Sequence, residues 1–391
     1  MNKIIISIIA LCVHAGAKAQ DMEAVLQSIE NNNKELQVIR KSNEASVLEV
    51  KAGNSLEDLS VEYSPFYRKG VRGVESSELV VTQGFDFPTL YASRRKSENL
   101  QQTVFDLQYL ASRRDILLEA KNVCLDLILI EKRKAVLEVR SKNTDELLRL
   151  YEKKMEEGDA TIIEINKIKM EQMGIAAEVA RNESARRVSM QALVALNGGE
   201  PLSFSDCRYP AYSMEKEDYE TLKERYVSAD LTLRTAQAEA AVSRQEVKVN
   251  KQGAIPKLEV GYRRNTEMKN ASNGFLVGAS IPIFSNRRKV QAAKARFITA
   301  QMQQDNVRVQ AENKVHALYE EMKTLKSAVE AYDTDLMYST LGILRKAVEE
   351  GELSLTEYYT EADGIYESLL EYIELENQYM KVVADFCKND L

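Results

Sequence analysis

Hydrophobic and polar residues alternate along four short segments of the chain, with a period of two that is typical of strands with one apolar face. In one of these segments, Leu258, Val260 and Tyr262 alternate with polar or small residues. The predicted strands lie near residues 56–64, 78–87, 257–264 and 274–283. The same alternation would suit two soluble hairpins that cap a coiled coil, so the pattern alone leaves both interpretations open.

Long stretches with neither glycine nor proline follow each pair of predicted strands. Between Pro88 and Gly158 lie 69 residues of this kind, and residues 283–341 form a second stretch of 59. At 1.5 Å per residue, a helix through most of the first stretch would be about 100 Å long. Helices of this length are typical of coiled-coil or tube-like assemblies. We therefore expect long helical hairpins over residues 92–197 and 287–386.

The two halves of the chain repeat each other. Three landmarks recur in order: a proline after the second strand of each pair, an Arg-Arg-Lys triplet and a Glu-Glu-Gly triplet. They begin at Pro88, Arg94 and Glu156 in the first half and at Pro282, Arg287 and Glu349 in the second, offset by 194, 193 and 193 residues. Such register indicates an internal duplication. We expect a first repeat over residues 20–199, a connector over 200–225 and a second repeat over 226–391.

The first 19 residues have the pattern of a secretory signal peptide, with Lys3 before an apolar run and Ala17-Lys18-Ala19 as a cleavage site. We expect cleavage after Ala19, which would change the net charge from −7 to −9 by removing two lysines. A short membrane anchor is the alternative, but the apolar run falls well short of the ~20 residues that span a bilayer. A lipoprotein site at Cys12 is a further alternative, although bulky Leu11 precedes it.

The composition argues against an enzyme and against nucleic-acid binding. The chain has a formal net charge of −7 and two histidines, His14 and His316, of which the first lies in the expected leader. No basic footprint, His-rich metal site or common catalytic motif follows. We expect no enzymatic activity, no cofactor and no metal site. The three remaining cysteines, Cys124, Cys207 and Cys387, are too widely spaced for a disulfide framework.

No stretch after the leader approaches 18 consecutive apolar residues, so any insertion into a bilayer would have to use the strands. Four strands cannot close a barrel, because the smallest bacterial barrels use about eight. Several copies would have to share one wall, with eight strands from two copies or twelve from three. The predicted fold class is mainly α, and if the strands enter a membrane they would make a small contribution to a β-barrel.

The chain resembles the TolC-like outer-membrane efflux protein family over essentially its whole mature length. The resemblance lies in the strand segments 255–262 and 277–284, in the helix-break segments 158–164 and 351–358, and in the Leu-Val-Ala-Leu-Asn-Gly stretch at 193–198. The order, spacing and duplication of these segments are more specific than any one of them. Residues 351–358 look most like the branch that serves heavy-metal cation pumps.

This resemblance implies a homotrimer with a twelve-stranded barrel in the outer membrane and a long periplasmic α-helical tunnel. It also implies two partners, a periplasmic adaptor and an inner-membrane transporter of the RND or ABC type. The function expected is passive, gated export of small molecules or metal cations. A periplasmic coiled-coil adaptor or structural protein, and an exit duct for type I protein secretion, are the alternatives.

The resemblance also assigns roles to two pairs of residues near the Glu-Glu-Gly triplets. Glu164 and Glu357 match the acidic positions that line the constriction at the inner end of the tunnel, where a ring of carboxylates would favour cations. The alternative is that both are ordinary acids in the first turn of a helix. Gly158 and Gly351 match the hairpin turns that meet the adaptor. A simple helix kink is the alternative for these glycines.

Residues at the ends of the strands are candidates for the membrane interface. Four arginines lie just past the strands, where they would meet anionic headgroups, although a solvated helix start would explain them equally. Nearby aromatic residues would suit the interfacial belt, with ordinary packing as the alternative. These candidates are Arg94, Arg95, Arg287, Arg288, Tyr63, Phe87, Tyr91, Tyr262 and Phe284.

Overall fold

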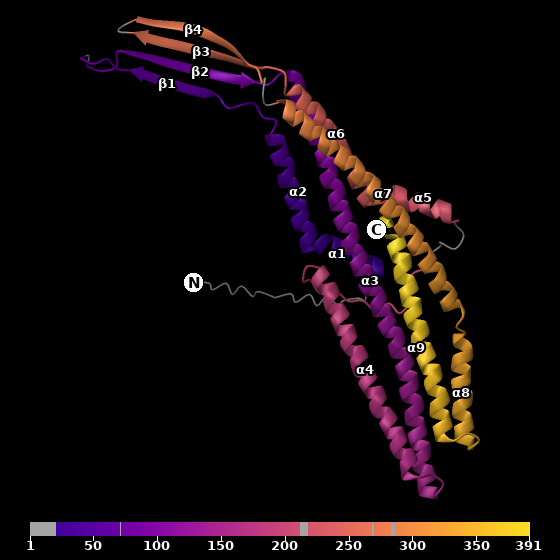
Figure 1. Cartoon of the computed structure of the whole chain (residues 1–391). Coiled ribbons are helices and arrows are strands. Elements are labelled where there is room, and N and C mark those ends of the chain that lie inside the picture. Colours follow the sequence, from indigo (N-terminus) through magenta and orange to yellow (C-terminus); the bar gives the residue numbers. More distant parts are fainter. Residues whose placement is uncertain (1–20, 71, 212–217, 268–269, 283–285) are drawn as a thin grey trace, which may run out of the picture. The chain divides into compact units, whose positions relative to one another are not determined.

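The computed structural model describes residues 21–70, 72–211, 218–267, 270–282 and 286–391. The predicted signal peptide at 1–19 lies outside the described residues. The described part is mainly α-helical with one four-stranded sheet, which confirms the predicted fold class (Figure 1). The elements are α1 (Met22–Asn32), α2 (Lys34–Ala52), β1 (Ser60–Phe66), β2 (Ser76–Phe85), α3 (Pro88–Glu157), α4 (Ile162–Leu196), α5 (Tyr219–Ala229), α6 (Leu231–Gln252), β3 (Lys257–Glu267), β4 (Asn270–Ser280), α7 (Asn286–Glu330), α8 (Thr334–Glu350), α9 (Leu355–Phe386) and the short 3₁₀ helix η1 (Lys388–Asp390).

The order of elements repeats: two helices, two strands, then a long helix that turns back. The chain nevertheless divides into two compact units that each combine parts of both halves. The first unit takes residues 1–34, 115–216 and 318–391, and the second takes 35–114 and 217–317. The predicted division near residues 199 and 226 is based on the order of the repeats along the chain. The compact units are instead defined by the segments that pack against one another.

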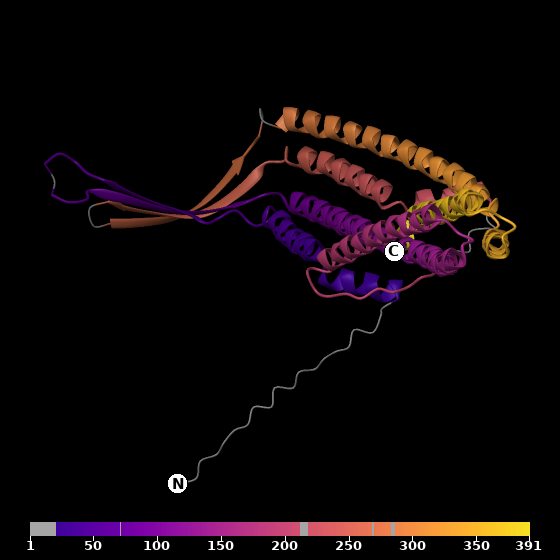
Figure 2. The same ribbon diagram turned by 90° about the horizontal axis from the view of Figure 1, so that it is seen from below.

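The sheet in the second unit is antiparallel throughout, with strand order β1-β2-β3-β4 (Figure 2). The two repeats meet at the β2–β3 pair, where Phe85 lies opposite Leu258. The strands start or end a few residues from their predicted bounds. Before β1, the Glu57 carbonyl accepts a hydrogen bond of 2.6 Å from the Gln83 side chain instead of joining the ladder. The centre of the sheet thus joins the two halves, and within the described part of the chain no strand pairs with its two edges, β1 and β4.

One face of the sheet is apolar and the other is polar. The register places every second residue of each strand on one face. The apolar members of the first face are Val61, Tyr63, Leu79, Val81, Phe85, Leu258, Val260, Tyr262, Phe275, Val277 and Ala279. In a single chain this face is bare, since Phe275 is 93% exposed and Val277 is 82% exposed. None of the described residues covers this face.

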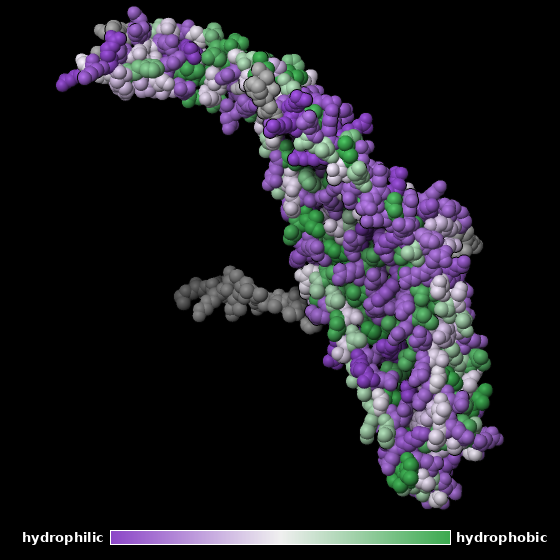
Figure 3. Space-filling view, viewed as in Figure 1, coloured by the Kyte–Doolittle hydropathy of each residue, from purple (hydrophilic) through white to green (hydrophobic). Residues whose placement is uncertain are grey.

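The first unit holds two helical hairpins, formed by α3 with α4 and by α8 with α9 (Figure 1). Their apolar faces share one buried cluster that includes Leu147 and Ile168 from the first hairpin and Leu341, Tyr358 and Leu369 from the second. Elsewhere the helices mix polar and apolar residues over their surface (Figure 3). Among the described residues, no helix combines the length and hydropathy needed to cross a bilayer.

The second long helical stretch is not continuous, which corrects the expectation from its lack of glycine and proline. Helix α7 ends at Glu330 and α8 begins at Thr334. Asp333 causes the break, because its carboxylate accepts a hydrogen bond of 2.9 Å from the Leu336 N–H and so caps a new helix. Asp230 separates α5 from α6 in the same way, with a bond of 2.7 Å from the Leu233 N–H. An aspartate can therefore start a new helix without any breaker.

We expect Asp333→Ala to weaken the start of α8 by about 1 kcal/mol, because it removes the N-cap acceptor. Hydrogen exchange of the amides in the first turn of α8 should accelerate about five-fold. The control is Asp335→Ala, which removes a nearby acid that is not the cap and should change exchange by much less. Equal effects of the two substitutions would show that Asp333 does not define this boundary.

Candidate functional site at the two hairpin turns

The two helical hairpins turn in the same way, one in each repeat. Gly158 and Gly351 have positive φ values of 87° and 78° and follow the last residues of α3 and α8. After Gly158, the Asp159 N–H bonds to the Lys154 carbonyl at 2.7 Å; after Gly351, the next N–H bonds to the Ala347 carbonyl at 2.8 Å. Each glycine N–H also bonds back three residues. This is the Schellman motif, which explains why glycine stands at both turns.

Each returning helix begins with a capping box. The Thr161 hydroxyl accepts a bond of 3.3 Å from the Glu164 N–H, and the Glu164 carboxylate accepts one of 2.7 Å from the Thr161 N–H. Ser354 and Glu357 repeat this exchange with distances of 3.2 Å and 3.0 Å. Reciprocal bonds of this kind satisfy two backbone donors that the start of a helix would leave open. The duplicated Gly-x-x-Ser/Thr-x-x-Glu segment thus builds the whole turn.

Glu164 and Glu357 therefore have a structural task in addition to the pore role predicted for them. In each carboxylate, the Oε2 atom accepts the cap bonds. The bonds from Ser354 lower the pKa of Glu357 below its ordinary value of 4.5. The charge of Glu357 is thus fixed beside the turn, on an exposed residue. The role of these residues in a constriction stays a prediction.

The surroundings of the two turns differ. Leu355 is buried next to the second turn, whereas its counterpart Ile162 is 56% exposed and the adjoining Ile163 is 75% exposed. Tyr358 and Tyr359 are buried just beyond Leu355 in the shared cluster. The second turn is therefore anchored in the core, while the first presents an apolar surface. The pattern of the sequence, with the same spacing in both turns, did not distinguish them.

Ion pairs hold the two hairpins against each other. The Arg140 guanidinium on α3 lies 2.6 Å from Glu171 on α4 and 2.9 Å from Asp363 on α9. It also lies over the Tyr366 ring, 5.2 Å from the ring centroid. Burial raises the pKa of Asp363, and Arg140 opposes that shift. Sequence reasoning missed this centre, because nothing in the spacing shows which face of α3 meets α9.

An ion pair and a hydrogen bond also join the two hairpins, closer to the turns. Arg345 on α8 lies 2.5 Å from Glu146 on α3. Nearby, the Lys154 ammonium donates a hydrogen bond of 3.4 Å to the Val348 carbonyl. Both contacts connect the first repeat with the second.

The candidate membrane-interface arginines differ in their surroundings. Arg94 has a protein partner, since it lies 2.7 Å from the nearly buried carboxylate of Asp86. By contrast, Arg95, Arg287 and Arg288 are exposed. On the apolar face of the sheet, Tyr262 is exposed and its hydroxyl bonds to the Asn273 side chain at 2.8 Å. Phe284 lies outside the described residues.

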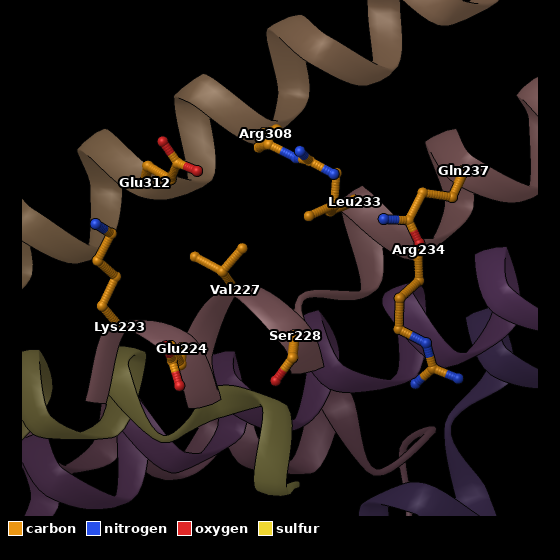
Figure 4. Close-up of a pocket in the computed structure, with 9 residues that line it drawn as sticks. All are labelled: Lys223, Glu224, Val227, Ser228, Leu233, Arg234, Gln237, Arg308 and Glu312. Atoms are coloured by element: carbon orange, nitrogen blue, oxygen red, sulfur yellow. The ribbon is translucent and has the colours of Figure 1, made fainter. Parts of the chain in front are cut away.

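A hollow of about 430 Å³ lies between α5, α6 and α7 in the second unit (Figure 4). Its lining carries charges of both signs, with Lys223, Arg234 and Arg308 beside Glu224 and Glu312. Val227 and Leu233 form its apolar floor. Within the described residues, no group of three or more His, Cys, Asp or Glu side chains could hold a metal ion.

Residues 225–382 match the model of the outer membrane efflux protein family. The match covers 158 of the 391 residues, and over this segment the chain is similar to that family. The match includes β3, β4, the second hairpin and its turn. Over this segment, it bears out the predicted family, the predicted outer-membrane location and the predicted class of function, an efflux channel. This family of efflux proteins consists of transport channels rather than enzymes.

Solved structures share the fold of this chain at low sequence identity. The outer membrane protein VceC from Vibrio cholerae is 13% identical, with a TM-score of 0.73 over 94% of this chain and 95% of that chain. The CmeC outer membrane channel of Campylobacter jejuni is 13% identical, with a TM-score of 0.72 over 94% and 85%. The MtrE channel of Neisseria gonorrhoeae is 11% identical, with a TM-score of 0.66 over 94% and 88%. No curated protein matched the sequence of this chain.

We expect Gly351→Ala to destabilise the second turn by about 1 kcal/mol. No atom lies within 4 Å of the added Cβ, so the cost comes from the positive φ alone. The control is Gly342→Ala in the middle of α8, where the surroundings are equally open and alanine should stabilise the helix by about 0.5–1 kcal/mol. Thermal unfolding of the two variants should shift in opposite directions. A shift in the same direction would contradict the assignment of Gly351 as the residue that allows the turn.

Proposed function

We propose that three copies of this chain form a gated conduit through the outer membrane that conducts small molecules or metal cations passively and catalyses no reaction. The observation that carries this proposal is the sheet, with two free edges and one bare apolar face. Strands β3 and β4 have 11 residues each and β2 has 10, the length that crosses a bilayer when tilted. Three copies would pair β4 of one chain with β1 of the next and close twelve strands.

The proposal gives the helical part the role of a periplasmic tunnel whose inner end is formed by the hairpin turns. A periplasmic adaptor would dock at these turns and an inner-membrane transporter would supply the energy. The exposed Ile162 and Ile163 support docking at the first turn, beside Gly158. Gly351 would mark the second docking turn. The ion pairs of Arg140 and Arg345 would keep the two hairpins of each chain together at this end.

We further propose that Glu357 and Glu164 from three copies line the constriction. Glu357 is exposed, one helical turn beyond the hairpin turn, and its cap keeps it ionised. Three carboxylates around a narrow passage would favour cations and repel anions. The cap also fixes the position of these charges, because each carboxylate is bonded to the start of its own helix.

The lipid-facing role of the sheet can be tested with two neighbouring residues. We expect Val277→Lys to cost about 2–4 kcal/mol, because it would place a charge on the lipid face near the bilayer midplane. The matched control is Leu276→Lys, which changes the adjacent residue on the polar face. Only the first variant should be depleted from the alkali-washed outer-membrane fraction. Equal recovery of both, or a wild-type chain that is a water-soluble monomer, would refute the channel.

The charge of Glu357 can be separated from its cap. Glu357→Gln keeps a capping side chain but removes the charge, so it should weaken cation preference in planar bilayers and leave stability nearly unchanged. Ser354→Ala should do the reverse, costing about 1 kcal/mol of helix stability with selectivity intact. Unchanged selectivity in Glu357→Gln would remove Glu357 from the constriction.

The pH dependence follows from the same bonds. A carboxyl group whose pKa is lowered in the folded state stabilises the fold above its unfolded pKa, and this contribution is lost as the pH falls through the folded value. The bonds from Ser354 lower the pKa of Glu357, so Ser354→Ala should lose its cation preference at a higher pH than the wild type. The same half-maximal pH for the two proteins in single-channel recordings would contradict this assignment.

A further inference from the structure

The charged residues of the sheet are divided very unevenly between its two faces. The four strands are described in full, and their polar face carries Glu62, Glu78, Lys257, Glu259, Arg263 and Glu267. The apolar face carries one charged residue only, Arg264. A single cation on a face otherwise suited to lipid requires an explanation, because an ionised side chain is costly in hydrocarbon.

Arg264 lies at the border of the apolar face. The register places it in one row with Tyr63, Leu79 and Asn273 across the four strands. The row nearer the helices contains only apolar residues and Tyr262, whereas the row beyond has two polar residues, Ser77 and Thr266, beside Pro65 and Ala271. The large apolar side chains therefore end at the row of Arg264.

This border lies at the end of the sheet remote from the helices. Arg264 lies seven positions after Lys257, which begins β3. At ~3.3 Å per residue, this corresponds to about 23 Å along the strand. This length is of the same order as the ~25 Å apolar band of outer-membrane barrels. With the helices in the periplasm, Arg264 would lie at the headgroups of the outer leaflet, where an outward charge is tolerated far better than at the midplane.

The neighbouring arginine has a different environment. Arg263 points to the polar face and lies 2.9 Å from the Glu78 carboxylate, which neutralises it. Arg264 has no ion pair among the described residues, and no acidic residue of the four strands shares its face. Beside it, the Tyr262 hydroxyl bonds to Asn273, as expected for a tyrosine with its polar end at the interface.

We propose that Arg264 binds the phosphate group of an outer-leaflet lipid, with Tyr262 and Asn273 forming the polar rim of the site. The guanidinium matches phosphate oxygens with two parallel N–H donors, and the apolar row below it would contact the acyl chains. Three such sites would surround a trimer. The inference rests on the proposed membrane channel, because it needs the apolar face to lie in lipid.

The test compares two adjacent arginines in the full-length channel. Native mass spectrometry in detergent would measure retention of lipid A, with and without its phosphates, by the wild type, Arg264→Gln and Arg263→Gln. We expect Arg264→Gln to weaken binding of the phosphorylated lipid about five-fold and Arg263→Gln to leave it unchanged. The dephosphorylated lipid should bind all three proteins equally, and Arg264→Lys should restore most of the difference.

Equal binding by wild type and Arg264→Gln would overturn the proposal, and so would an equal loss in the two Gln variants. Conductance in planar bilayers separates this failure from failure of the channel itself. If both variants conduct like the wild type but do not differ in lipid binding, only the lipid site is wrong. If the wild type does not insert or conduct, the proposed function fails first.

Discussion

The structure depends on hydrogen bonds and apolar burial that a single chain cannot complete. A strand at the edge of a sheet leaves a row of N–H and C=O groups without partners, and this sheet has two such edges, β1 and β4. Its apolar face is bare as well, as Phe275 and Val277 demonstrate. Association with other copies and with lipid would satisfy both requirements at once. The long helices are consistent with this arrangement, since they continue directly from the strands.

The hairpin turns illustrate how one short segment can serve structure and function together. Gly351 allows the reversal, Ser354 starts the returning helix, and Glu357 completes the cap. The same carboxylate would then be available as a fixed charge in a pore. The first turn has the same backbone bonds, as the predicted duplication would produce. The surroundings have diverged, because Leu355 is buried where Ile162 is exposed.

Much of the fold could be predicted because local signals agreed with one another. The alternation in the strands, the spacing of the glycines and the register of the repeats all indicated the same arrangement. The break at Asp333 could not be predicted from the absence of glycine and proline. It arises because the Asp333 side chain accepts a hydrogen bond from the Leu336 N–H and so caps a new helix. The Arg140 centre was also out of reach, since it joins α3 to α9 across 223 residues. Of the candidate site, the turns and capping residues carried a local signature, whereas their surroundings did not.

The β2–β3 ladder joins the repeats within each chain, with Phe85 opposite Leu258. In the proposed ring of twelve strands, a chain with only one repeat would supply two strands, so six identical subunits would be needed. Joining two repeats in one chain would place half of the contacts between hairpins within a chain. It would also allow the two halves to differ, so that alternate positions around the ring could specialise.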